Sequence, residues 1–151
     1  MSRNKRILVA IPTAKYIEVE TFRSLWDLDV PEGFELDFRY SFGYHVAQIR
    51  NLITSWVVNE KYDYLFAVDS DIILPKDALT KLLSHNLPIV SGLYIQKRDD
   101  KVIPEVYRIY ADGMLNVPIK DLVPRGIHQI DGCGFGCVLV QRAVFEDVQY
   151  P

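Results

Sequence analysis

The sequence has 151 residues, of which 49% are hydrophobic and 25% are charged, and its formal net charge is −3. This length suits one compact α/β domain, and the composition is that of an ordinary globular protein. The acidic balance argues against a nucleic-acid partner, which needs a basic surface, but it permits an anionic ligand that binds through a cation.

Two features of the sequence bear on where the protein resides. Basic residues precede the apolar run 7–11, but this run is too short for a signal peptide and ends at Pro12. No stretch has the length and apolarity of a transmembrane helix. Cys133 and Cys137 lie four positions apart, which on a strand is too far for a disulfide. We therefore expect a reduced, cytoplasmic protein without a transmembrane segment.

The first 92 residues alternate between strand and helix patterns. Short apolar or alternating runs predict strands over residues 7–11, 34–40, 62–68 and 87–92. Apolar residues three or four positions apart predict helices over residues 17–28, 44–60 and 76–85. This alternation indicates βαβ units in a mostly parallel sheet. We expect Trp26 and Trp56, which fall on apolar helix faces, to lie in the core.

The rest of the chain has a less regular pattern. Strands are predicted over 106–110 and 137–140, with a hairpin turn at Asp112-Gly113. A last helix is predicted over 143–149. The charged run 97–101 is interpreted as a solvated loop.

An acidic triplet, Asp69-Ser70-Asp71, follows directly after the apolar strand 62–68. Ligands of open α/β sheets bind at the carboxyl ends of strands. If the chain is locally extended there, both carboxylates point the same way, and two such oxygen donors without Cys or His suit Mg²⁺ or Mn²⁺. The alternative interpretation is a polar turn in which the aspartates cap the following segment.

The triplet resembles the DxD motif of GT-A fold glycosyltransferases, especially those similar to family 2. Other segments resemble parts of that family in the same order. They are the first strand with its nucleotide-contacting loop at 7–13, the helix with an Arg-Asn pair at 47–51, the strand after the next helix at 91–94, and the Gly-rich acceptor-side strand at 132–142.

The resemblance implies a three-layer GT-A-like (Rossmann-like) domain with a mostly parallel central sheet. It implies one domain over 1–151, with a nucleotide-binding βαβ part at 1–92 and the start of an acceptor-side part at 93–151. The expected activity is metal-dependent transfer of a sugar from a nucleoside-diphosphate sugar to a glycan, lipid or protein acceptor.

The same resemblance implies roles for individual residues. The nucleotide-sugar site comprises Pro12, Thr13, Ala14, Arg50, Asp69, Ser70 and Asp71. Asp71 is expected to be the main protein ligand of the Mn²⁺ or Mg²⁺ ion. Asp69 is expected to contact the ribose, or to contact the metal through water. Asp131 and Gly132 are expected on the sugar or acceptor side, although a turn-forming Asp is an equally good interpretation of Asp131.

The sequence does not identify a catalytic base. Inverting relatives use a carboxylate that follows the last helix, often in a Glu-Asp pair. Glu146-Asp147 is such a pair, but it falls within the predicted last helix and is interpreted as solvated helix surface. We therefore expect the base beyond residue 151 and the acceptor-side part to be incomplete at its C-terminus.

Two other functions stay open. A phosphatase of the haloacid dehalogenase type also carries an Asp-x-Asp at a strand end, but usually on its first strand, whereas here two βα units come first. A non-catalytic nucleotide-binding domain would need the triplet but no base. Phosphate release from a phosphomonoester would favour the first, and nucleotide binding without turnover the second.

Overall fold

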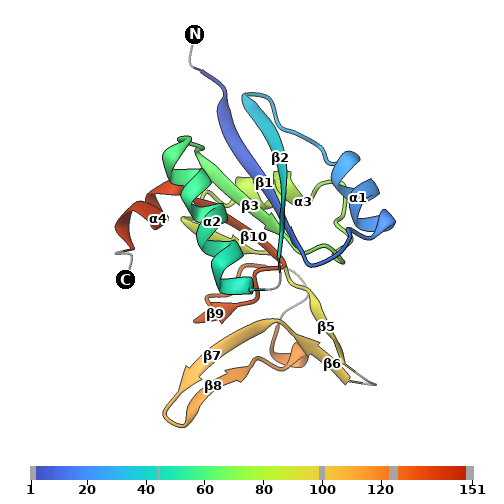
Figure 1. The fold of residues 1–151 in the computed structure, drawn as a ribbon. Helices are drawn as coiled ribbons and strands as arrows, with labels where there is room; N and C mark the ends of the chain where they lie inside the picture. The colour runs from blue at the N-terminus through green and yellow to red at the C-terminus, as the bar shows by residue number, and fades with distance from the viewer. Residues whose placement is uncertain (1–2, 44, 99–100, 123–125, 149–151) are drawn as a thin grey trace. The chain divides into compact units, whose positions relative to one another are not determined.

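A computed structural model of the chain describes residues 3–43, 45–98, 101–122 and 126–148. Within them the chain forms helices and a mixed set of parallel and antiparallel strands, which confirms the α/β class (Figure 1). The chain divides into two compact units, Met1–Gly92 with Gly136–Pro151, and Leu93–Phe135. The boundary after residue 92 coincides with the predicted division, while residues from 136 onward return to the first unit.

The first unit contains a five-stranded sheet in the order β2-β1-β3-β10-β4. These strands are β1 (Lys5–Thr13), β2 (Phe34–Phe42), β3 (Tyr64–Val68), β4 (Ile89–Ser91) and β10 (Cys137–Gln141). β1 pairs parallel with both β2 and β3, whereas β10 pairs antiparallel with β3 and β4. The prediction of a mostly parallel sheet is therefore right for β1 to β3 and wrong for β10, and the sheet as a whole is mixed.

The core of this unit lies on the two central strands β1 and β3. Residues 7–10 and 65–68 have no exposed surface at all. A continuous apolar run of this kind is expected where a strand is covered on both faces. Burial of a Leu, Ile or Phe side chain contributes roughly 1.5–3 kcal/mol. These two strands therefore form the rigid base on which the loops at their carboxyl ends stand.

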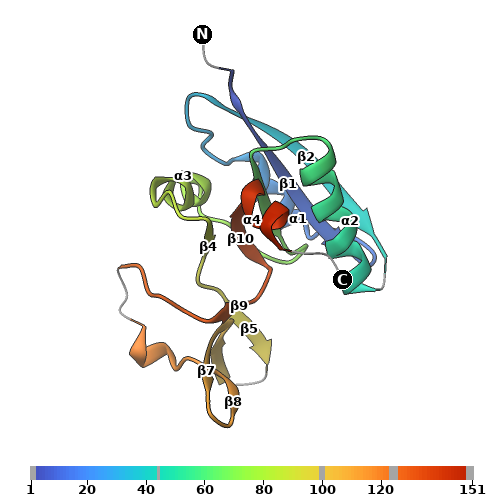
Figure 2. The ribbon, with the colours of Figure 1, turned by 90° about the vertical axis from the view of Figure 1, so that its left-hand side faces the viewer.

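Four helices flank the sheet: α1 (Val19–Trp26), α2 (Val46–Asn59), α3 (Ala78–Ser84) and α4 (Arg142–Asp147). α2 and α4 lie on one face and contact each other, and α1 and α3 lie on the opposite face (Figures 1 and 2). α2 buries Ile49, Ile53 and Val57, which recur every four residues as the apolar stripe predicted. In the described part of the chain, no helix is long and apolar enough to cross a bilayer.

The end of α2 explains why β3 starts two residues later than predicted. Lys61 adopts a left-handed conformation with φ of 57°. The Tyr62 N–H donates to the Val57 carbonyl at 3.1 Å, and the Lys61 N–H donates to the Val58 carbonyl at 3.3 Å. This pair of bonds is the Schellman motif that closes many helices. Residues 61 and 62 therefore belong to the turn, and the strand begins at Tyr64.

The helix α1 is shorter than predicted, and its apolar residues are mostly not in the core. Leu25 is buried, but Val19 and Phe22 are exposed, and Trp26 is 79% exposed. The prediction that Trp26 lies in the core is therefore wrong, while Trp56 is half-buried. A helix of eight residues is too short to cover the whole face of two nine-residue strands, which leaves part of this face to solvent.

The second unit consists of short antiparallel strands. β5 (Ile95–Arg98) pairs with β6 (Lys101–Pro104), and β7 (Val106–Tyr110) pairs with β8 (Gly113–Asn116) and β9 (Gly132–Cys133). A short 3-10 helix, η1 (Ile119–Asp121), follows β8. The interpretation of the charged run as a loop is wrong for Lys97, Arg98 and Lys101, which lie on β5 and β6; Asp99 and Asp100 lie outside the described residues. The turn predicted at Asp112-Gly113 is confirmed.

Candidate functional site

The candidate site lies where the sheet of the first unit reverses its strand order. From β1 the chain crosses by α1 to β2 on one side, and later by α2 to β3 on the other side of β1. The parallel register aligns Ala10 with Ala67, so β1 and β3 end side by side. In open α/β sheets, ligands bind outside the carboxyl ends of strands at such a reversal. The loops after β1 and β3 are the ones that carry the predicted residues.

The acidic triplet forms a turn at the carboxyl end of β3. The Ile72 N–H donates to the Asp69 carbonyl at 3.2 Å, which closes residues 69–72 into a hydrogen-bonded turn. The chain is therefore not locally extended here, and its backbone is the turn of the alternative interpretation. Val68 is buried, Asp69 and Ser70 are half-buried, and Asp71 is exposed. Both carboxylates thus leave a single turn that is anchored on a buried strand.

The Gly-rich segment supports this turn from the neighbouring strand. The Asp69 N–H donates to the Gly136 carbonyl at 3.0 Å. Next to it, the Gly92 N–H donates to the Cys137 carbonyl at 2.9 Å. A Cβ on Gly92 would lie 2.7 Å from the Cys137 Sγ, so a larger residue there would require the Cys137 side chain to shift. Sequence reasoning missed this support, although the dense glycines of residues 132–136 were its signal.

The loop after β1 is held in place by Thr13. Its buried hydroxyl donates to the Tyr16 carbonyl at 2.7 Å and accepts from the Lys15 N–H at 3.3 Å. The Glu18 N–H then donates to the Ser70 carbonyl at 2.9 Å. The structure therefore joins the loop that contains Thr13 and Ala14 to the acidic triplet. The Thr13 side chain fixes the loop, in which Ala14, Lys15 and Tyr16 are exposed, while Pro12 before it on β1 is half-buried.

Arg50 comes from the third segment that approaches this edge. β2 ends at Phe42, and α2 begins at Val46, so the first turns of α2 lie just after the carboxyl end of a parallel strand. Arg50 is half-buried, and its carbonyl accepts a hydrogen bond from the Thr54 hydroxyl at 2.9 Å. Its position on α2 fits the predicted helix, and its role in a nucleotide site stays a prediction.

Asp131 and Gly132 belong to the second unit and have structural contacts there. The Asp131 carboxylate accepts from the Ile109 N–H at 2.9 Å, and the Asp131 N–H donates to the Tyr107 carbonyl at 3.0 Å. Gly132 pairs with Tyr107 in the ladder between β7 and β9. These contacts favour the turn interpretation of Asp131, and its role toward an acceptor stays a prediction.

The Glu146-Asp147 pair lies on the surface of α4. Glu146 forms an ion pair with Arg142 at 2.9 Å, one helical turn away, and both acidic residues are exposed. This arrangement is that of a solvated helix face, as the sequence analysis interpreted it.

A metal ion at this site would have few protein ligands among the described residues. Among these residues, no group of three or more His, Cys, Asp or Glu side chains is arranged to hold a metal ion. Asp69 and Asp71 each carry a carboxylate, which is a hard oxygen donor. Mg²⁺ and Mn²⁺ sites commonly use one or two carboxylates and complete their shells with substrate phosphates and water. The donor set therefore fits such an ion bound together with a phosphate-bearing ligand.

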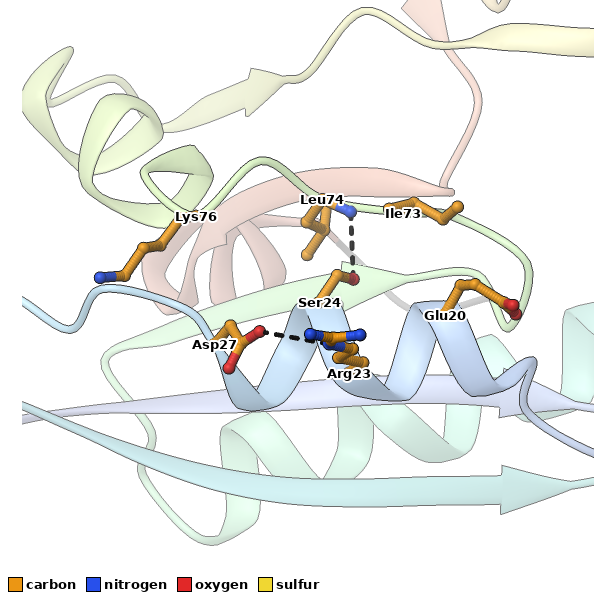
Figure 3. A pocket seen from close by; sticks show the side chains of 7 residues that line it. All are labelled: Glu20, Arg23, Ser24, Asp27, Ile73, Leu74 and Lys76. Carbon is orange, nitrogen blue, oxygen red and sulfur yellow. Dashed lines mark hydrogen bonds and ion pairs between the residues drawn. The ribbon is translucent and has the colours of Figure 1, made fainter.

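A hollow of about 550 Å³ lies beside α1 and the segment that follows the triplet (Figure 3). It is lined by Glu20, Arg23, Ser24, Asp27, Ile73, Leu74 and Lys76. The Leu74 N–H donates to the Ser24 Oγ at 3.1 Å, which ties the segment after the triplet to α1. Charges of both signs border the hollow, and neither Asp69 nor Asp71 lines it. The hollow therefore lies next to the candidate site and is not part of it, since the site is defined by the triplet.

The comparisons with known proteins concern the fold. No family model matches the chain, and no curated protein matches it either. Among solved structures, A197 from STIV is similar, with 21% sequence identity and a TM-score of 0.65 over 97% of this chain and 70% of that chain. At this level of identity the similarity shows a shared fold and carries no information on activity.

Proposed function

We propose that the chain is a GT-A-like glycosyltransferase domain that binds a nucleoside-diphosphate sugar at the carboxyl ends of β1 and β3. The observation that carries this proposal is the acidic turn Asp69-Ser70-Asp71, which stands on a buried strand and is hydrogen-bonded to the loop after β1. The triplet and the loop after β1 lie next to each other at the carboxyl ends of β3 and β1. The strand order of the sheet reverses there, and such ligands bind at a reversal of this kind.

In this proposal Asp69 and Asp71 hold Mn²⁺ or Mg²⁺ with the diphosphate. Transfer of the sugar develops negative charge on the departing diphosphate, and a divalent ion bridging its oxygens stabilises that charge. The protein contributes orientation. The bond from the Asp69 N–H to the Gly136 carbonyl and the bond from the Ile72 N–H to the Asp69 carbonyl fix the backbone of the turn from which both carboxylates extend.

The loop after β1 is proposed to contact the nucleoside. Half-buried Pro12 at the end of β1 and exposed Ala14 at the start of the loop are the proposed contacts, and the Thr13 hydroxyl keeps the backbone of the loop fixed. Arg50, at the start of α2, is proposed to add positive charge toward the phosphates, for which a guanidinium is well suited. The helices on both faces of the sheet and the parallel pairing of β1 with β2 and β3 support a GT-A-like arrangement. No described residue is assigned as general base.

Thermal unfolding in the presence of UDP, GDP, CDP and dTDP, each with and without Mn²⁺, tests the proposal directly. We expect one nucleotide to raise the melting temperature only when Mn²⁺ is present. Saturation at about 100 times Kd adds roughly 2.7 kcal/mol to the free energy of unfolding. Asp71→Asn should abolish this stabilisation, and Asp147→Asn, an exposed carboxylate on α4, should leave it intact.

The outcomes separate the proposal from its alternatives. Stabilisation by a nucleotide that survives Asp71→Asn would exclude the triplet as the metal and diphosphate site. No stabilisation by any of the four nucleotides would overturn the proposal. If binding is confirmed, sugar release or transfer from the matching nucleotide sugar distinguishes an enzyme from a binding domain, and phosphate release from a phosphomonoester identifies a phosphatase.

A further inference from the structure

The strand β2 forms an open edge of the five-stranded sheet (Figure 1). Its nine residues pair continuously with β1, and β1 is its only strand neighbour among the described residues. Proteins usually protect such an edge with Pro, Lys or a β-bulge, because its unpaired backbone groups bind other strands. The sequence of β2, FELDFRYSF, contains neither Pro nor Lys, and its register with β1 has no bulge.

The ladder with β1 shows which backbone groups of β2 face outward. At one end the Lys5 N–H donates to the Gly33 carbonyl at 2.8 Å, and at the other the Gly43 N–H donates to the Thr13 carbonyl at 3.2 Å. Backbone groups alternate in direction along a strand, so the odd-numbered residues of β2 turn their N–H and C=O toward β1. The even-numbered residues, with Phe38 at their centre, turn theirs away from the sheet.

The even-numbered side chains of β2 make one face of this edge apolar. They are Phe34, Leu36, Phe38, Tyr40 and Phe42. Leu36, Phe38 and Tyr40 line a groove of about 480 Å³ together with Phe22 and Trp26 of α1. The groove therefore continues the aromatic row of the strand onto the short helix. Sequence reasoning missed it because it placed Trp26 in the core.

The exposed area of this surface is close to what a stable interface needs. Phe38, Tyr40 and Phe42 are 50%, 68% and 63% exposed, and Phe22 and Trp26 are 57% and 79% exposed. With 150–250 Å² for each aromatic side chain, these five residues present roughly 500–800 Å². A specific interface buries about 800 Å² per partner. Monomeric proteins rarely leave an apolar patch of this size uncovered.

The odd-numbered side chains carry charge on the other face, toward α2. Asp37 accepts a hydrogen bond from Arg6 at 2.8 Å, and Arg39 forms a bidentate ion pair with Glu60. Asp37 and Arg39 retain 49% and 35% of their side-chain exposure. They thus stay accessible to a strand that adds to the edge.

We propose that β2 pairs antiparallel with β2 of a second copy of this chain, with the two-fold axis at Phe38. This register places Phe38 opposite itself, Leu36 opposite Tyr40, and Phe34 opposite Phe42 on the apolar face. On the other face it places Asp37 of each copy opposite Arg39 of the other. The two sheets join into one of ten strands, and the two apolar rows lie side by side on the same face, where opposite side chains contact each other.

Charge selects this register among those that the backbone allows. Because only even-numbered residues face outward, an antiparallel pair of identical strands can shift only in steps that keep even opposite even. A shift that centres the axis on Asp37 places two aspartates opposite each other, and one centred on Arg39 places two arginines together. A shift centred on Leu36 places Glu35 opposite Asp37. The shift centred on Asp37 also places Glu35 of each copy opposite Arg39 of the other, but the Phe38 register is the one among these with two attractive charge pairs and no like-charged pair.

Sedimentation velocity over a range of concentrations tests the dimer. We expect wild type to sediment at about twice the 17.4 kDa mass of one chain. Phe38→Lys should raise the dissociation constant at least about tenfold, because it places two ammonium groups at the axis of an edge strand. Tyr110→Lys, at a residue of similar exposure on β7, is the matched control and should remain dimeric. A monomeric wild type at about 100 μM, far above a typical specific Kd, would overturn the proposal.

Charge reversal tests the pairing itself, with the folding of each variant checked by circular dichroism. Asp37→Arg places two cations at the pairing positions, and Arg39→Asp places two carboxylates there. Each variant alone should dimerise more weakly than wild type, whereas an equimolar mixture of the two should form a heterodimer with near wild-type affinity. If both variants dimerise alone as tightly as wild type, or if the mixture stays monomeric while each variant is folded by circular dichroism, the proposed pairing is excluded.

Cross-linking tests the register. Residues opposite each other in a hydrogen-bonded antiparallel pair have Cα atoms about 5.5 Å apart, within the range of a disulfide. Phe38→Cys should therefore form a covalent dimer under mild oxidation, while Tyr40→Cys should not, because it faces Leu36 of the other copy. Wild type controls for Cys133 and Cys137. A Tyr40→Cys dimer, or none with Phe38→Cys, would contradict the assigned axis.

Discussion

The two compact units bury their strands to very different extents. In the first unit, β1 and β3 contain four consecutive residues each with no exposed surface. In the second unit, the buried hydrophobic residues among those described are Val106 and Val117, and β8 is exposed along its whole length. A sheet covered on both faces is held together by apolar packing, whereas short hairpins rest on turns and single hydrogen bonds. The candidate site stands on the first kind of structure, which can hold a turn of charged residues in place.

The largest expected difference between the units is the loss of unfolding free energy when one apolar side chain in each unit is truncated to alanine. Phe66→Ala on β3 should lower the free energy of unfolding by about 3–5 kcal/mol, because Phe66 is fully buried. Ile109→Ala on β7 should change it by less than about 0.5 kcal/mol, because Ile109 is 66% exposed. Urea unfolding followed by circular dichroism measures both. Equal effects would show that the packing difference between the units does not govern stability.

Glycines next to close neighbours allow the second comparison. Gly92→Ala places a Cβ 2.7 Å from the Cys137 Sγ in the first unit and should cost about 1–3 kcal/mol. Gly134→Ala would place a Cβ in overlap with the Tyr94 hydroxyl, 2.9 Å from the Tyr94 Cζ and 3.2 Å from the Glu105 Cβ in the second unit, so we expect a loss at least as large. Chemical denaturation measures both.

The double variant Gly92→Ala/Cys137→Ala controls for this explanation. It removes the sulfur that the new Cβ meets, so it should be more stable than the sum of the two single effects. Strict additivity would show that the close approach to Cys137 is not the cause.

Loop hydrogen bonds should show a smaller contrast. Thr13→Val removes a buried hydroxyl that serves both Tyr16 and Lys15, and we expect a loss of about 1 kcal/mol. Asp131→Ala removes the acceptor of the Ile109 N–H on an exposed strand, where water replaces it, and should cost less. Thermal unfolding measures the two losses. A greater loss for Asp131 would mean that the second unit depends on this bond more than its exposure indicates.

The smallest expected effects lie at opposite ends of the pH range. The hydrogen bond from Arg6 holds the pKa of Asp37 below its ordinary value. The resulting stabilisation is present above the unfolded pKa of about 4 and is lost as the pH falls through the lower folded pKa. Because the Asp37 side chain is 49% exposed, it amounts to well under about 1 kcal/mol.

In the second unit, the hydrogen bond to Glu105, followed by burial, raises the pKa of Tyr107. A raised pKa has the opposite consequence. Its stabilisation is present below the unfolded pKa of about 10 and is lost as the pH rises through the higher folded pKa. The pH dependence of the unfolding free energy measures both ends. Asp37→Asn should flatten the acid side and Tyr107→Phe the alkaline side, and an exchange of these effects would contradict the assignment.

The accuracy of the sequence analysis follows the same division. The apolar runs that became β1 and β3 were predicted within two residues, because burial on both faces leaves an unambiguous pattern. β7 was predicted at its observed bounds, helped by the Asp112-Gly113 turn. β5 and β6 were missed, because a charged hairpin has the composition of a loop and its pairing depends on contacts that no single segment encodes.

At the candidate site, the triplet and the loop after β1 were both named from the sequence, and the structure brings them together through the bond from the Glu18 N–H to the Ser70 carbonyl. The sequence did not decide between an extended chain and a turn at the triplet, since local alternation cannot show that residue 72 bonds back to residue 69. The support from Gly136 was also missed, because it comes from a strand far away in the sequence.

The sequence by itself therefore determined the buried strands, the position of the acidic triplet after one of them, and the apolar stripe of α2, because each of these depends on neighbouring residues. Only the tertiary structure decided that β10 runs antiparallel between β3 and β4, that the triplet is a turn held by Gly136, and that Trp26 faces solvent beside an open strand. These features depend on which distant segments meet, and on how much of a sheet face a helix of given length can cover.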